Sequence, residues 1–242
     1  MNDISHPSVE GHEVRTDPDA PARRDDHEGD GATRGTDRLE AFADAVFAIA
    51  FTLPVVHIVL PESKEEGRRL GHSLLELWPS YAGYLLASFV IGLYWVHHHF
   101  SGAIYRTTGH WFLVFSVLFL AAIGFIAFPA RAFAEHLSDP EAREAASIYW
   151  VVSLAVLSAT WLLKWTVGRL RGQVDARLER SYVARLNRRY WLFVLLNLLA
   201  ALLVLWSWPV GLALSTVLTL SLLWPPETPR YITEAPIVEG ES

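Results

Sequence analysis

The chain of 242 residues is 52% hydrophobic and contains 10 Trp, a composition too apolar for an ordinary soluble domain of this length. It has no cysteine, which excludes disulfides, thiolate zinc sites and thiol chemistry. The formal net charge of −6 comes largely from the tails and loops, and it gives no indication of a nucleic-acid partner.

The two ends of the chain differ in composition from its middle. Residues 1–36 contain no apolar run and are rich in Asp, Glu, Arg, Gly, Pro and His. Such a segment cannot bury enough surface to fold alone, so the sequence predicts a disordered N-terminal tail. It also lacks the apolar stretch and cleavage site of a signal peptide. Residues 226–242 are predicted to form a C-terminal tail.

Between the tails, six segments are candidates for crossing a bilayer, which takes about 20 mostly apolar residues. They cover about residues 38–60, 74–99, 110–133, 147–167, 190–206 and 209–224. The last two belong to one apolar run that would rise roughly 50 Å as a single helix, too far for one bilayer. Pro209 supplies a break, with one long kinked helix as the alternative. The sequence therefore predicts an all-α membrane protein with six transmembrane helices over residues 37–225.

Basic residues in the connections predict the orientation, because cytoplasmic loops carry an excess of Lys and Arg. The connection between the fourth and fifth segments holds eight: Lys164, Arg169, Arg171, Arg177, Arg180, Arg185, Arg188 and Arg189. If this connection is cytoplasmic, an even number of helices places both termini in the cytoplasm and the protein in the cell membrane. The loop after the first segment is then outside, although it carries Lys64, Arg68 and Arg69.

The first segment combines an acid with an aliphatic stripe. At about 100° per residue, Ile49, Leu53 and Val56 fall on one side, and Asp44 lies about 140° away from Ile49. An ionised Asp in a membrane helix needs a partner, and Arg38 is poorly placed to be one. Asp44 is therefore a polar link between helices, a participant in transport, or both. Periodicity alone favours packing for the stripe, and a Thr in a membrane helix, here Thr52, usually bonds its own backbone.

Three adjacent histidines, His97, His98 and His99, close the second segment. They point about 100° apart, so they lack the i, i+3 or i, i+4 spacing that puts metal ligands on one face. We therefore predict no metal site. In the proposed topology His98 and Asp44 lie at a similar depth, which makes them a candidate hydrogen-bonded pair.

These residues resemble the transmembrane protein 175 family of prokaryotic and lysosomal potassium channels. The family motif is Arg, three residues and then Phe-Ser-Asp, and the chain has Arg38, Phe42, Ala43 and Asp44, with Ala in place of the Ser. The family's Trp and His-His at the end of the second helix match a further set of residues: Trp95, His98 and His99. A proline in the third helix, Pro129, is a weaker match.

The resemblance implies a potassium-permeable channel, a homotetramer in which the first helix lines a central pore. In the family, aliphatic residues five, nine and twelve positions after the motif Asp form the constriction, and these are Ile49, Leu53 and Val56 here. Thr52 would add polar coordination near the constriction. The motif residues and their partners would set the rotation of the helix: Arg38, Phe42, Asp44, Trp95, His98 and His99. No cofactor is implied, and the only ligands are permeant potassium ions and the lipid bilayer.

Two other classes of function remain as alternatives. A proton-coupled transporter or proton pathway would use Asp44 and His98, but the chain has no second copy of its first segment, whereas transporters commonly contain paired repeats. A membrane enzyme would need a nucleophile or a set of metal ligands that converge, and the sequence indicates neither. The carbonyl-lined filter loop of ordinary potassium channels is absent from the sequence as well.

Overall fold

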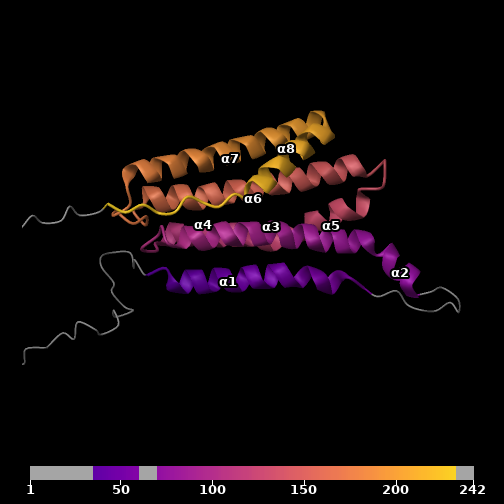
Figure 1. Ribbon diagram of the computed structural model, residues 1–242, viewed down its shortest axis with the longest axis horizontal. Helices are drawn as coiled ribbons and strands as arrows, with labels where there is room; N and C mark the ends of the chain where they lie inside the picture. Colours follow the sequence, from indigo (N-terminus) through magenta and orange to yellow (C-terminus); the bar gives the residue numbers. More distant parts are fainter. Residues whose placement is uncertain (1–34, 60–69, 233–242) are drawn as a thin grey trace, which may run out of the picture.

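The computed structural model describes residues 35–59 and 70–232, and in this part of the chain the long helices run side by side (Figure 1). Five helical stretches are long and apolar enough to cross a membrane, and one further apolar helix is shorter. The predicted helical membrane fold is therefore confirmed. The elements are α1 (Asp37–Thr52), η1 (Leu53–His57), α2 (Leu70–Glu76), α3 (Trp78–Gly102), α4 (His110–Phe125), α5 (Ala127–His136), α6 (Arg143–Leu170), α7 (Arg180–Trp206) and α8 (Trp208–Ser221).

The first helix ends earlier than the sequence predicted. The expected helix over residues 38–60 becomes α1 followed by the 3₁₀ turn η1, which begins at Leu53. Pro54 explains the change, because it has no N–H to donate and its ring crowds the carbonyl of the preceding turn. Leu53 and Val56 therefore lie in η1, where a spacing of 100° per residue no longer describes the side-chain directions.

Proline also divides the third predicted segment. The helix expected over residues 110–133 is broken at Ile126, between α4 and α5. Pro129 cannot donate a hydrogen bond to the Phe125 carbonyl, which weakens the helix one turn before it. The Ala130 N–H still reaches the Ile126 carbonyl at 3.2 Å, so the two helices continue in nearly the same direction.

The last apolar run divides as predicted, with Ser207 in an extended conformation between α7 and α8. The alternative of one kinked helix is therefore wrong. α7 begins at Arg180, ten residues before the predicted start, because Tyr182 and Leu186 in its charged first turns are buried and hold them in the helix. α7 and α8 approach each other so closely that a Cβ on Gly211 would clash with the Val204 backbone.

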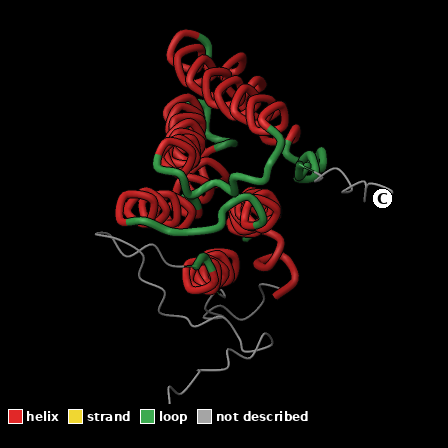
Figure 2. The backbone as a smooth tube through the Cα atoms, turned by 90° about the vertical axis from the view of Figure 1, so that its left-hand side faces the viewer, coloured by secondary structure: helices red, strands yellow, loops and turns green. Residues whose placement is uncertain are grey.

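α6 is the central helix of the bundle. It packs against α4, α5, α7 and α8, whereas α1 packs mainly against α3, α4 and its own continuation η1. Figure 1 accordingly shows α1 at one edge and α7 at the other, and Figure 2 shows the helices end-on around a shared interior. A second, smaller core forms at one end of the bundle, around Tyr105, Phe112, Trp165 and Tyr182. We call this end the basic end, because exposed arginines gather in the connection 171–179 and at the start of α7.

At the basic end, the residues after α8 return across the first turns of α7. The Ile232 N–H donates to the Arg177 carbonyl at 2.8 Å, and the Glu179 N–H donates to the Arg230 carbonyl at 2.9 Å. Arg185 and Glu227 form an ion pair at 2.8 Å. The beginning of the predicted C-terminal tail thus packs on the helices, while residues 233–242 and nearly all of the predicted N-terminal tail lie outside the described residues.

Candidate functional site: the first helix and its contacts

α1 has one face turned into the bundle and one face left open. Ala43, Phe47 and Ala50 are buried in the main core. The predicted aliphatic stripe is exposed on the single chain, with Ile49 at 55%, Leu53 at 50% and Val56 at 72%. The stripe is therefore accessible, as a pore-facing surface requires, although Val56 follows the end of the α-helix.

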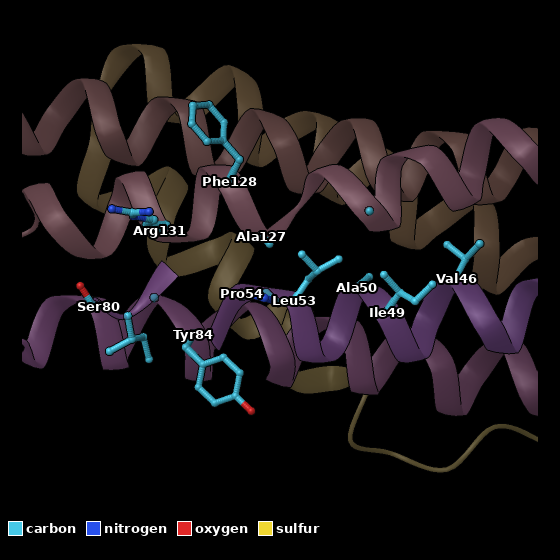
Figure 3. Close-up of a pocket in the computed structure, with 13 residues that line it drawn as sticks. Val46, Ile49, Ala50, Leu53, Pro54, Ser80, Tyr84, Ala127, Phe128 and Arg131 are labelled. Carbon is cyan, nitrogen blue, oxygen red and sulfur yellow. The ribbon is translucent and has the colours of Figure 1, made fainter. Parts of the chain in front are cut away.

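Two of the stripe residues border an apolar groove between α1 and the α4–α5 break. Ile49 and Leu53 lie on one side of the groove, and Ala127 and Phe128 lie on the other (Figure 3). The cavity has a volume of about 360 Å³. At its rim, Arg131 donates to Glu135 one turn further along α5 at 2.6 Å. The groove is lined mainly by apolar side chains, with Ser80, Tyr84 and Arg131 as its polar members.

The motif aspartate connects α1 to α3. The Trp95 indole N–H donates to the Asp44 carboxylate at 3.0 Å, and the His99 ring stacks on Trp95 at 5.6 Å between centroids. Asp44, Trp95 and Thr52 also line a second hollow, of about 590 Å³, between α1 and α3. The bond joins two helices, and the role that the sequence resemblance implied for these residues, setting the rotation of α1, stays a prediction.

The predicted pair of Asp44 and His98 is wrong. His98 is buried, and its Nε2 lies 2.9 Å from the Nζ of Lys164 on α6. The His98 ring also stacks on Phe119, with centroids 5.9 Å apart. Helical position decides the outcome, because Trp95 lies one turn nearer Asp44 on the outer side of α3 while His98 points inward to α6.

Lys164 is the residue that the sequence analysis missed, since it counted only as an orientation signal. Its ammonium group lies over the rings of Tyr105, Phe112 and Phe119, at 5.5 to 5.7 Å from the ring centroids. Cation–π contact of this kind compensates in part for the removal of a charge from water. A single Lys within the apolar run of α6 was the available signal, because such a residue needs partners inside the protein.

Three other predicted residues, Arg38, Phe42 and Thr52, are exposed and lie outside the core. The Thr52 hydroxyl donates to the Ala48 carbonyl at 2.8 Å and lies 3.3 Å from that of Ile49, so it is satisfied by its own helix. Arg38 is exposed and Phe42 is 51% exposed. Neither is brought into the core, and the proposed anchoring role of these two residues stays a prediction.

His97, which the sequence analysis set aside, holds the end of the last helix. Its Nε2 lies 2.7 Å from the Leu222 carbonyl, immediately after α8. The last carbonyls of a helix have no partner within it, and they are costly to leave unpaired in an apolar environment. The histidine cluster thus has three separate contacts, to α8, to α6 and to Trp95. No cluster of three metal-binding side chains occurs in residues 35–59 and 70–232.

Comparison with known proteins identifies the family of the chain. Residues 38–127 match the model of the family described as endosomal/lysosomal potassium channel TMEM175. A protein of Chamaesiphon minutus named "Potassium channel Cha6605_3372" is 39% identical over 159 residues, which cover 64% of this chain and 77% of that one. The chain belongs to the TMEM175 family.

Further relatives extend the match beyond α1. "Potassium channel B446_29190" of Streptomyces collinus is 34% identical over 143 residues, covering 59% of this chain and 69% of that protein. The crystal structure of a lysosomal potassium-selective channel TMEM175 homolog from Chamaesiphon minutus superposes with a TM-score of 0.65 at 31% identity. The superposition covers 78% of this chain and 96% of that one. The shared fold therefore includes most of the helices described above, and the TMEM175 assignment does not depend on the motif alone.

Proposed function

We propose that the chain forms a potassium-permeable channel for passive ion conduction, a homotetramer in which four copies of α1 surround a central pore. Two observations support this function: the relatives are named potassium channels, and α1 has an exposed aliphatic side opposite its buried one. The exposed stripe carries the argument, because a helix at the edge of the bundle is free to face an axis shared by several copies.

In this proposal the aliphatic stripe forms the constriction. Rings of Ile49, Leu53 and Val56 make a narrow and weakly hydrated neck that closes by dewetting. A cation must shed part of its hydration shell to pass, and potassium holds its water less tightly than sodium. Modest selectivity follows without a dedicated coordination cage. Thr52 would add polar coordination near the neck, because its hydroxyl hydrogen is donated within α1 and the oxygen lone pairs remain available to a cation.

The bond between Asp44 and Trp95 supports the pore from behind. It joins α1 to α3 at Asp44, which precedes the stripe along α1, so the stripe keeps a fixed direction. We place the basic end in the cytoplasm of a cell membrane, with both termini there, because the eight Lys and Arg residues of 164–189 lie at or near this end. The proposal assigns the chain no catalytic activity and no cofactor.

A proton pathway through Asp44 and His98 receives less support. The two side chains have different partners, Trp95 and Lys164, and an indole N–H cannot relay a proton at neutral pH. We therefore treat both residues as structural supports of the pore-lining helix.

Potassium flux into liposomes that contain the purified protein tests the function, with Ile49→Asn as the diagnostic variant. Leu192→Asn on α7 is a matched control, since Ile49 and Leu192 are both 55% exposed on the single chain. Ile49→Asn is expected to change the flux of potassium or its ratio to sodium flux. Leu192→Asn is expected to leave both unchanged in correctly assembled protein.

The mass of the protein in detergent tests the assembly. A tetramer is expected, and a monomer that still conducts would contradict the shared pore. Equal effects of the two Asn variants on flux would contradict the assignment of the constriction. Absence of potassium flux from a folded tetramer would overturn the channel function itself.

A further inference from the structure

The turn between α6 and α7 forms a groove that the channel function does not use. The cavity has a volume of about 430 Å³ and lies at the basic end, between the last turn of α6 and the first turns of α7. Arg169 borders it on α6, and Arg180 borders it on α7. The remaining lining is mostly small or apolar: Val174, Asp175, Ala176, Leu178, Val183, Ala184 and Asn187.

The groove carries a net positive charge. Its one acid, Asp175, is held by Arg177, whose guanidinium donates to both carboxylate oxygens at 2.7 to 3.1 Å. These hydrogen bonds hold the pKa of Asp175 at about 2, so its negative charge is permanent and already compensated. Arg169 and Arg180 are both exposed, and neither has an ion-pair partner among the described residues. Two guanidinium groups are therefore available to an anion.

The groove is continuous with an apolar surface of α7 that has the position and composition of a lipid-facing side. Residues 180, 184, 187 and 191 follow at intervals of four, three and four, which places them on one side of the helix. The same side continues into exposed leucines, Leu195 at 54% and Leu198 at 44%. Trp191, 44% exposed, lies between the polar and apolar parts, where membrane proteins place Trp at the bilayer interface.

We propose that this groove binds the headgroup phosphate of an anionic phospholipid. Arg169 and Arg180 would hold the phosphate, because guanidinium groups bind phosphate oxygens through paired hydrogen bonds. Asn187 accepts a hydrogen bond from the Trp165 indole at its oxygen, which leaves its amide nitrogen as a further donor at the inner end. The acyl chains would lie along Leu195 and Leu198.

Charge complementarity and continuity with the bilayer select a lipid over a free anion. A soluble phosphate would gain only the polar contacts, whereas a lipid also keeps its chains on the apolar side of α7. The partial positive charge at the start of α7 strengthens the attraction for either ligand and does not distinguish them.

Native mass spectrometry of the full-length protein tests the proposal in detergent with equal amounts of phosphatidylglycerol and phosphatidylcholine. A direct contact between a guanidinium and the phosphate contributes at least about five-fold to binding, so Arg169→Gln with Arg180→Gln is expected to lower the preference for phosphatidylglycerol about 25-fold or more. The control, Arg106→Gln with Arg230→Gln, removes the same charge from exposed positions at the same end outside the groove. It is expected to keep the preference within about two-fold.

Three results would overturn the proposal. Equal losses in the two double variants would indicate a diffuse attraction to the basic end. Displacement of phosphatidylglycerol by millimolar glycerol 1-phosphate would indicate a free phosphate as the ligand. A preference that appears only after removal of residues 233–242 would indicate that this acidic segment occupies the groove. A variant with Lys at both arginine positions guards against misfolding, and it is expected to retain an intermediate preference because it keeps the charge and loses the paired hydrogen bonds.

Discussion

α1 and α6 are both apolar helices, but within a single chain α6 is mostly buried and α1 is mostly exposed. In the most apolar window of α6, 67% of residues are buried, against 22% in the window that contains α1. α6 contacts four neighbouring helices, and three buried tryptophans, Trp150, Trp161 and Trp165, fix its position. α1 depends on one buried side and on the bond between Asp44 and Trp95. A single chain therefore buries most of α6 and leaves most of α1 exposed.

Low burial has a different meaning in α7, whose window is also 22% buried. The exposed residues of α7 within the apolar run are mainly leucines, which suit contact with lipid: Leu192, Leu195, Leu198, Leu199, Leu202 and Leu205. The open side of α1 also includes Asp44 and Thr52. Because an acid is costly against lipid, composition favours protein or water as the neighbour of α1.

Removing a large side chain from α6 is expected to have the greatest effect on stability. Trp165 is completely buried, contacts Tyr190 and donates to Asn187. Trp165→Ala should lower the free energy of unfolding by about 3–5 kcal/mol, mostly through the cavity that it leaves. Thermal unfolding in detergent measures the change. Trp206→Ala, at a position 89% exposed, is the control and should alter stability by less than about 0.5 kcal/mol. Similar losses in both variants would contradict the central role of α6.

The contact between Lys164 and His98 links α6 to α3, and α1 packs against α3. His98→Phe keeps a ring against Phe119 but removes the acceptor of the buried ammonium group, at an expected cost of about 3 kcal/mol. Adding Lys164→Met removes the stranded charge and should restore most of the loss. Unfolding of the two single variants and the double variant gives the coupling. Additive losses would show that the contact between Nζ and Nε2 has no net effect on stability.

The bond between α1 and α3 is expected to matter less for stability, because Asp44 is exposed on the single chain. Asp44→Ala and Trp95→Phe should each cost about 1 kcal/mol, with a coupling of similar size in the double variant. Potassium flux should fall more than stability does, because the bond fixes the direction of the stripe. Unchanged flux in all three variants would argue against control of the pore by this bond.

The smallest expected effect concerns the loop that joins α6 to α7. Arg177 lowers the pKa of Asp175 from its ordinary value of 3.8 to about 2, so the ion pair stabilises the fold above pH 4 and its contribution disappears as the pH falls toward 2. Asp175→Asn should therefore lower the melting temperature slightly at pH 7 and leave it unchanged near pH 2. Glu141→Gln, in the exposed loop at the opposite end, is the control. A difference that persists at the acid end would exclude ionisation of Asp175 as its cause.

The sequence was sufficient for the helices whose signals are local. Pro209 marked the boundary between α7 and α8, and the motif residues around Asp44 led to the correct family. Local signals were misjudged where proline acts on the preceding turn, as Pro54 and Pro129 do. Contacts between distant segments could not be derived, because His98 and Lys164 are 66 positions apart and the sequence between them does not indicate which sides of α3 and α6 meet. The proposed topology gave a similar depth for Asp44 and His98 but not the direction of each side chain.

The contact between His97 and the Leu222 carbonyl has a consequence for the order of synthesis. The two residues are 125 positions apart, so α3 enters the membrane long before its partner has been translated. Until then the imidazole of His97 lacks this hydrogen-bond acceptor, and the helices already inserted contain a polar group without this partner. Insertion of α8 supplies the missing carbonyl, so a segment translated late completes the contacts of α3.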